Sequence, residues 1–158
     1  MPHDHNHDHS FCIDDAIERA VAICEERGVR FTELRKTVLG LVWRGHESVK
    51  AYDLLDQLAG LGGSAKPPTV YRALEFLMEQ GLVHKIESLN AYVGCPHPGE
   101  DHVSQFFICD SCGHVEEVNI PNLEVLINEQ ALKGGFKIYR QTVEIRGQCK
   151  GCTSKAET

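Results

Sequence analysis

Apolar residues recur at a helical period through the first third of the chain, and each run ends at a residue that stops helices. The spacing predicts a helix that ends at Gly28, a second helix capped by Thr32, and a third over residues 50–61. The apolar side chains expected to face the core are Ile13, Ile17, Val21 and Cys24, then Leu34, Val38, Leu41 and Val42, then Leu54, Leu55, Leu58 and Leu61.

A fourth helix is predicted after the run Lys66-Pro67-Pro68-Thr69, a rigid entry in which Thr69 is the expected cap, and Gly81 should end it. Beyond Gly81 the apolar period falls toward two, so LVHKIES and NAYVG read as two strands joined by a turn at Leu89-Asn90. Helices followed by a β-hairpin predict a winged helix-turn-helix whose fourth helix takes the recognition role. The inward side chains of that helix are expected to be Val70, Leu74, Leu77 and Met78.

The second half of the chain has a different pattern. Residues 95–103 contain two prolines and a glycine, which is typical of a hinge. Beyond them QFFIC and HVEEV read as strands, residues 121–133 as an amphipathic helix, and residues 136–146 as a last strand. The apolar positions of the last strand change from even to odd numbers, which predicts a bulge near residues 140–142. The expected fold class is α+β, an N-terminal winged helix-turn-helix plus a small C-terminal α/β domain.

The net charge of the chain is −7, which on its own argues against binding to nucleic acid. The charge is uneven, because residues 30–86 carry eight basic and six acidic side chains, a net charge of +2, between two acidic segments. Only this middle segment could face a phosphate backbone without net repulsion. The sequence contains neither an apolar run near the roughly 18 residues of a membrane span nor a signal peptide at its N-terminus, MPHDHNHDHS.

Four of the seven cysteines form two Cys-x-x-Cys pairs, Cys109/Cys112 and Cys149/Cys152. Four thiolates are the full ligand set of a closed structural zinc site, which has no open position for substrate. The alternative, a redox dithiol, needs one pair only, whereas here a second pair completes a ligand set. Zinc-bound cysteines rather than disulfides favour a reducing, cytoplasmic location. No catalytic triad, phosphate loop or paired catalytic carboxylates stand out, so we expect no enzyme.

The N-terminal tract His3, His5, His7 and His9 is either a solvated tail or a weak auxiliary metal site. It leaves open a second class of function, a zinc-buffering protein, which would need no winged helix. A third class, a thiol oxidoreductase using one Cys-x-x-Cys pair, would require a low cysteine pKa and leaves the Pro-Pro-Thr helix unexplained.

The run AKPPTVYRALEFLMEQGLVHKIESLNAYVGC, followed by DHVSQFFICDSCGHVEEV and CKGC, resembles the ferric-uptake-regulator family and, within it, the zinc-uptake branch. The resemblance covers roughly residues 13–152. It implies a homodimeric, metal-dependent transcriptional repressor that binds a palindromic operator in double-stranded DNA. The expected segments are then a disordered tail at 1–10, a DNA-binding domain at 11–94, a hinge at 95–103, and a dimerisation and zinc-binding domain at 104–158.

The resemblance also implies a second, regulatory zinc, about two zinc ions per subunit in all. A thiolate in a mixed set of nitrogen, sulfur and oxygen ligands favours zinc as the metal ion. The alternative that stays open is an iron, manganese, nickel or peroxide sensor of the same family. Other potential ligands near the hinge could form a weaker third site or replace a ligand. The regulatory ligands implied are His84, Cys95, His102 and Glu117, and those left open are His97, Glu100, Asp101 and His114.

The polar face of the fourth helix is the expected reading surface for DNA. Arg72 can reach a guanine edge with two hydrogen bonds and Tyr71 can touch a base or a thymine methyl, roles that the resemblance also implies. Thr69 lies on the same face. Candidate phosphate contacts are Lys66, Arg35 and Lys36, although the last two could equally be a solvated helix face.

Overall fold

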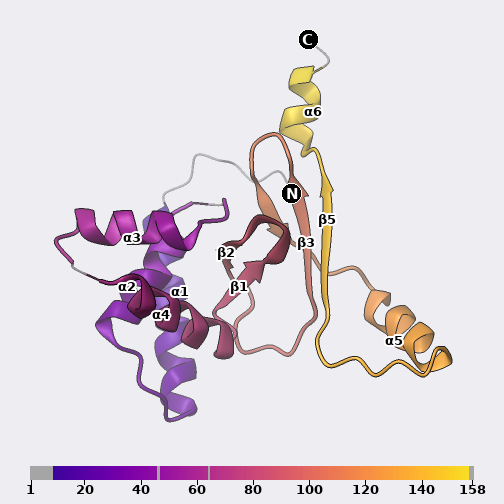
Figure 1. Ribbon diagram of the computed structural model, residues 1–158, viewed down its shortest axis with the longest axis horizontal. Coiled ribbons are helices and arrows are strands. Elements are labelled where there is room, and N and C mark those ends of the chain that lie inside the picture. Colours follow the sequence, from indigo (N-terminus) through magenta and orange to yellow (C-terminus); the bar gives the residue numbers. More distant parts are fainter. Residues whose placement is uncertain (1–8, 46, 64, 157–158) are drawn as a thin grey trace. The chain divides into compact units, whose positions relative to one another are not determined.

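The computed structural model describes residues 9–45, 47–63 and 65–156 (Figure 1). His3, His5 and His7, predicted to belong to a solvated tail or a weak metal site, lie outside the described residues. The chain divides into two compact units, residues 1–100 and 101–158, and the division falls inside the segment expected to be a hinge. The first helix begins at His9, within the segment expected to be a tail.

Four helices and a two-stranded hairpin make up the first unit. The helices occur where the apolar period predicted them, and the fully buried side chains Val38, Leu54, Val70 and Leu74 join them in one core. The elements in chain order are α1 (His9–Glu26), α2 (Glu33–Val42), α3 (Ala51–Gly60), α4 (Pro67–Glu79), β1 (Val83–Ile86) and β2 (Ala91–Gly94).

Two details of the helical core differ from the predicted apolar stripes. On α1 the buried positions are Ala16, Ala20 and Cys24, because the helix turns its small residues inward. The predicted inward residues Ile13, Ile17 and Val21 are only half-buried. Burial raises the pKa of the Cys24 thiol, as expected of a core residue rather than a ligand. Leu61 is 58% exposed, so its inward assignment was wrong. The helix α3 ends at Gly60, and Leu61 therefore lies past its last turn.

Helix capping follows the sequence at α2 but not at α4. The Thr32 side chain accepts a hydrogen bond from the Arg35 backbone N–H at 3.4 Å, which confirms the predicted cap. On α4 the N-cap is Lys66, and Pro67 and Pro68 occupy the first helical positions. The predicted capping role of Thr69 was therefore wrong, since a proline fits best in the first turn and moves the cap to the residue before it.

The hairpin after α4 is the predicted wing. Strands β1 and β2 pair antiparallel from Val83↔Gly94 to Ile86↔Ala91, and Asn90 takes the left-handed conformation in the connecting turn. A bridge between Val49 and Tyr92 ties the hairpin to the segment before α3. The winged helix-turn-helix expected from the change in period is therefore present.

The second unit is a three-stranded sheet with two helices. Its elements are β3 (Ser104–Cys109), β4 (Val115–Glu117), α5 (Leu123–Lys133), β5 (Thr142–Gly147) and α6 (Lys150–Ala156). The central strand β3 pairs antiparallel with β4 and parallel with β5. The pairing of β5 runs without interruption from Thr142 to Gly147, so the predicted bulge was wrong. The apolar positions change parity because residues 136–141 lie outside the sheet.

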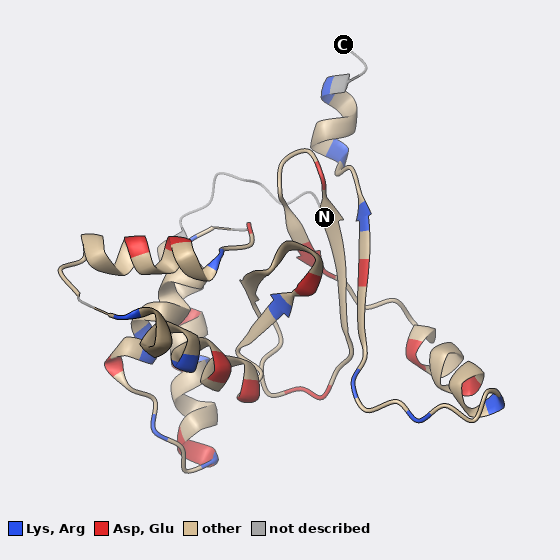
Figure 2. Cartoon of the chain, viewed as in Figure 1, with Lys and Arg blue, Asp and Glu red and all other residues tan. Residues whose placement is uncertain are grey.

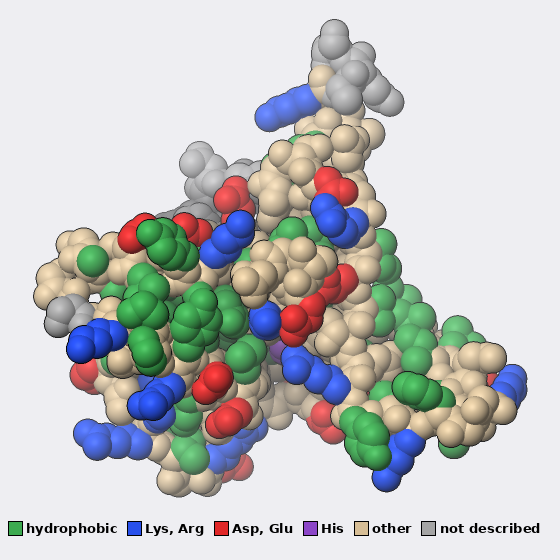
Figure 3. All heavy atoms as spheres, in the orientation of Figure 1, with side chains coloured by type: hydrophobic (Ala, Val, Ile, Leu, Met, Phe, Trp, Pro, Cys, Tyr) green, Lys and Arg blue, Asp and Glu red, His purple; other side chains and the backbone are tan. Residues whose placement is uncertain are grey.

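The second unit exposes much of its apolar surface. No residue of α5 is buried, and Leu132, Phe136 and Tyr139 are 79%, 69% and 87% exposed. Figure 3 shows hydrophobic side chains at the surface in the region of α5. Such a surface is typical of a protein–protein interface. No helix in the described residues is sufficiently long and apolar to cross a membrane. The α+β fold class is confirmed.

Candidate metal centre and nucleic-acid interface

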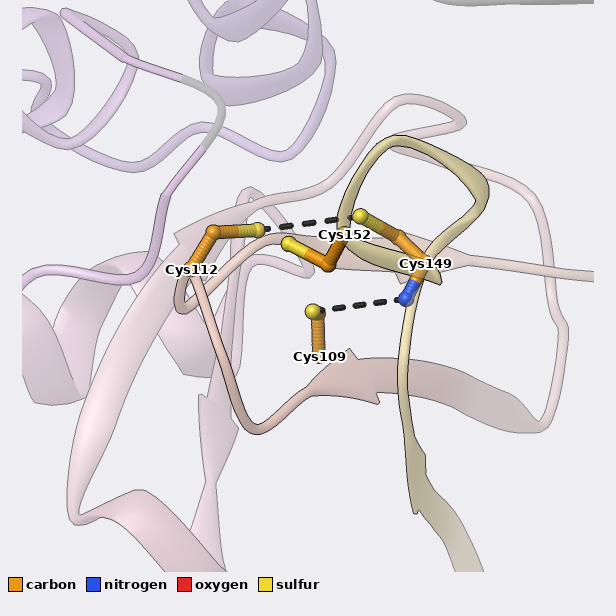
Figure 4. Close-up of side chains that lie close together, drawn as sticks. All are labelled: Cys109, Cys112, Cys149 and Cys152. Carbon is orange, nitrogen blue, oxygen red and sulfur yellow. Dashed lines mark hydrogen bonds between the residues drawn. The ribbon is translucent and has the colours of Figure 1, made fainter. Parts of the chain in front are cut away.

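The four cysteines of the two Cys-x-x-Cys pairs converge at one end of the sheet (Figure 4). Cys109 ends β3 and Cys149 directly precedes α6, and the parallel register places Cys109 opposite Gly147. This pairing brings together two motifs that 36 residues separate in the sequence. The four sulfur atoms all lie within 4.8 Å of one another, and none of the seven cysteines forms a disulfide.

The sulfur positions fit a tetrahedral zinc ion. A Zn–S bond of about 2.3 Å implies an S···S distance of about 3.8 Å in a tetrahedron. The Sγ atoms of Cys112 and Cys149 lie 3.8 Å apart. Two contacts beside the cluster join its two arms, an ion pair of 2.6 Å between Arg146 and Asp110 and a hydrogen bond of 3.1 Å from Gln148 to Ser111. The cluster can therefore accept zinc with little rearrangement.

The thiols of this cluster differ in acidity. The backbone N–H of Cys149 donates to Cys109 Sγ at 3.3 Å, and with the backbone N–H of Cys112 it lowers the pKa of Cys109 to about 6. Hydrogen bonds with the neighbouring thiols of Cys149 and Cys112 raise the pKa of Cys152 to about 12. Cys109 is thus a thiolate at neutral pH, whereas a metal ion must displace the proton of Cys152.

The predicted regulatory ligands form one pair in each unit. In the first unit, His84 on β1 and Cys95 after β2 place a ring nitrogen and the sulfur within 4.8 Å of each other. The Cys95 side chain is buried, and its backbone N–H donates to the Leu82 carbonyl at 3.0 Å. Tetrahedral zinc would hold such a nitrogen and sulfur about 3.6 Å apart, so this pair needs only a small adjustment.

The second unit supplies the other pair. His102 Nε2 donates to Glu117 Oε1 at 2.7 Å, and the Glu117 side chain is 7% exposed. A nitrogen and an oxygen that share tetrahedral zinc lie about 3.4 Å apart, so metal binding would replace this hydrogen bond. None of the residues left open for a third site, His97, Glu100, Asp101 and His114, belongs to a group of three or more potential ligands in the described part of the chain.

The outer face of α4 carries the predicted reading residues. Thr69 and Arg72 are exposed, Tyr71 is 47% exposed, and Val70 and Leu74 turn into the core. Lys66 is exposed at the N-cap, and Figure 2 shows a basic residue at the start of α4 and acidic residues toward its end. The first turns of α4 are therefore the part of this helix that suits a polyanion.

The two basic residues predicted on α2 already have partners within the protein. The guanidinium of Arg35 lies 3.5 Å from the centroid of the Phe76 ring and also donates to the Arg30 carbonyl. The ammonium of Lys36 pairs with Glu33 at 2.8 Å. One aromatic side chain that the sequence analysis did not single out, Tyr52 on α3, is 71% exposed. The sequence could have indicated Tyr52, because it is an aromatic residue outside the inward-facing apolar stripe of α3.

Comparisons with known proteins agree with this architecture. Residues 26–146 match the ferric uptake regulator family. The zinc uptake regulation protein of Escherichia coli (strain K12) is 44% identical over 139 residues, which cover 87% of this chain and 81% of that protein. A solved zinc uptake regulator complexed with zinc and DNA is 41% identical, with a TM-score of 0.88 over 92% of this chain and 98% of that one. The holo form of XcZur is 39% identical, with a TM-score of 0.82 over 93% and 99%. The chain therefore belongs to the ferric uptake regulator family, a family of transcription regulators and not of enzymes, as the sequence predicted.

Proposed function

We propose that this protein is a zinc-responsive transcriptional repressor that binds operator DNA as a zinc-loaded homodimer and represses zinc-uptake genes. The observation that carries the proposal is that each unit holds one pair of potential zinc ligands, His84 with Cys95 in the first and His102 with Glu117 in the second. The similar proteins support it, because one is a zinc uptake regulation protein and another was solved with zinc and DNA.

In the proposed mechanism the two ligand pairs hold one zinc ion between them. His84 and Cys95 restrain the wing that follows α4, and His102 and Glu117 restrain the sheet of the second unit. A shared divalent ion supplies the attraction that joins the two pairs, and so favours one arrangement of the units over the others. The free energy by which zinc favours that arrangement equals the difference in zinc-binding free energy between it and the alternative arrangements. When free zinc falls, this site empties and the operator is released.

The four-cysteine site has a different, structural role. It closes the end of the sheet and leaves no coordination position open, so its zinc should stay bound when the regulatory zinc leaves. The binding free energy of such structural sites is on the order of 10–16 kcal/mol and adds directly to the stability of the fold. We place the protein in the cytoplasm, where cysteine ligands stay reduced.

The second unit provides the proposed dimer interface. Many of its exposed apolar residues lie on α5 and on the segment that follows it, among them Leu126, Leu132 and Phe136. An isologous contact between two copies would bury this surface and place two α4 helices for the two half-sites of a palindrome. On α4 we assign base contacts to Arg72 and Tyr71 and a phosphate contact to Lys66, with Thr69 on the same face. Arg35 and Lys36 on α2 stay candidate phosphate contacts.

A thiolate ligand supplied by the buried Cys95 would favour zinc over harder metal ions. The test is a titration of an operator-containing DNA fragment with the purified protein at buffered free zinc, followed by fluorescence anisotropy. We expect zinc to promote binding and ferrous or manganese ions at equal free concentration to promote it weakly. Equal or stronger activation by iron or manganese would favour the alternative sensor of the same family.

A further inference from the structure

The only tryptophan of the chain, Trp43, lies against the backbone of Gly94, the residue before the proposed ligand Cys95. A Cβ atom added to Gly94 would lie 2.2 Å from Cε2, 2.3 Å from Nε1 and 2.7 Å from Cζ2 of the indole. The next shortest such contact at any of the 14 glycines is 3.2 Å, at Gly63. A side chain at position 94 and the indole of Trp43 therefore exclude each other.

The backbone conformation does not explain the glycine at position 94. Unlike Gly81 and Gly99, Gly94 does not have a positive φ, so other residues could adopt its conformation. It ends β2, paired with Val83. The space taken by the indole is what requires glycine here.

The indole also joins this strand end to the helical core. Trp43 is the C-cap of α2, its backbone N–H donates to the Leu39 carbonyl at 3.1 Å, and its ring packs against the buried cluster of the first unit. Trp43, Leu39, Leu82 and Cys95 line one cavity of about 200 Å³. The backbone around Cys95 is thus held on one side by the indole at Gly94 and on the other by the hydrogen bond to Leu82.

We propose that Trp43 is a positioning residue for the regulatory zinc site. Its indole, seated on Gly94, fixes the end of β2, sets the position of the Cys95 thiolate, and links the state of that ligand to α2. This inference rests on the proposed function, because it assumes that Cys95 binds zinc. Since Trp43 is the only tryptophan, all tryptophan emission comes from this one indole and its surroundings.

The test is the variant Gly94→Ala in the full chain carrying its structural zinc. The added methyl displaces the indole, so we expect the second zinc to bind about tenfold more weakly, which corresponds to about 1.4 kcal/mol. Zinc affinity is measured by competition with a chromogenic chelator, and the Trp43 emission should already differ before zinc is added. The matched control is Gly60→Ala in the same unit, where an added Cβ meets no atom within 4 Å. It should keep the wild-type affinity.

A double-mutant cycle separates positioning from a general loss of stability. Trp43→Leu removes the ring that the methyl would strike, so the double variant should bind the second zinc more tightly than the two single losses predict. Additive losses, or a wild-type affinity in Gly94→Ala, would overturn the inference. If Gly94→Ala does not fold, Trp43→Phe carries the test, because it removes ring atoms that touch Gly94 and adds none. A wild-type affinity in that variant would also overturn it.

The outcomes distinguish this inference from the function on which it rests. If the wild-type chain binds no second zinc, or if zinc does not change its affinity for the operator, the proposed function is wrong. If the wild-type chain responds to zinc and Gly94→Ala responds equally, only the positioning role of Trp43 fails.

Discussion

Cys95→Ser separates the proposed regulatory zinc from the structural one. The side chain is 2% exposed and serine is nearly the same size, so the first unit should fold normally while the soft thiolate is replaced by a poor zinc ligand. Changes that affect only the orientation of a metal ligand typically lower affinity by about 10–100-fold. Loss of the ligand itself should therefore lower the affinity for the second zinc at least about 100-fold, or about 2.7 kcal/mol.

This magnitude sets the conditions of the assay. At a free zinc concentration ten times the wild-type Kd, about nine tenths of the wild-type sites are filled, and a 100-fold weaker site is about one tenth filled. Operator affinity measured by anisotropy at this zinc concentration should fall correspondingly. Linkage adds a stricter requirement, since operator DNA must raise the zinc affinity of the wild-type chain by the same factor by which zinc raises its operator affinity. Factors of about 5–150 are usual for such coupling.

The control replaces a cysteine outside both proposed ligand sets. Cys12→Ser makes the same change of sulfur to oxygen on α1 and should keep zinc-dependent binding. Metal analysis should find one zinc per chain in Cys95→Ser and two in the control. The reasoning is refuted if Cys95→Ser still binds the operator in a fully zinc-dependent way, or if it loses both zinc ions.

Three further predictions concern the other parts of the molecule. Because the pKa of Cys152 is raised to about 12, zinc must displace its proton, and the logarithm of the association constant of the four-cysteine site should rise by at least about one per pH unit between pH 7 and 9. Cys109, with a pKa of about 6, adds to this slope only in more acidic solution, so the affinity should fall more steeply below about pH 6. Chelator competition from about pH 5 to about pH 9 checks both slopes, and a flat profile would contradict them. Leu132→Asp, at a position 79% exposed, should leave each chain folded but shift sedimentation from dimer toward monomer, and an unchanged dimer would place the interface elsewhere. Thr32→Ala removes the α2 cap and should lower the free energy of unfolding in urea by about 1 kcal/mol. Thr37→Ala, which removes a hydroxyl that donates to the Glu33 carbonyl of the same helix, should lower it less.

Local signals in the sequence were sufficient for the winged helix. The prolines before α4, the glycine after it, and the change of period toward two each act over a few residues, and the structure follows them. The errors arose at boundaries. Leu61 lies one residue beyond the end of α3, and the apolar positions before Thr142 belong to a segment outside the sheet. Periodicity identifies an element better than it locates the last residue of that element.

The candidate sites differ in how much of them the sequence could predict. The Cys-x-x-Cys pairs are recognisable from their spacing alone. No local pattern links His84 to Glu117, and only the family resemblance suggested these two residues as ligands. The direction of Arg35 was not predictable either, because its partner Phe76 is 41 residues away in the chain. An apolar pattern on residues 121–133 predicted a helix but could not indicate whether its apolar face would be buried within the chain.

The two prolines that open α4 have a consequence for how the helix can hold DNA. The first turn of a helix usually has several backbone N–H groups without an intrahelical partner, and these can donate hydrogen bonds to a phosphate without any side chain. Proline has no such hydrogen, and the next amides, of Thr69 and Val70, already bond to the Lys66 carbonyl at 2.9 and 3.3 Å. The leading turn is therefore stiff but poor in donors. Attraction to the sugar–phosphate chains must come from long cationic side chains, and added electrolyte should weaken it markedly.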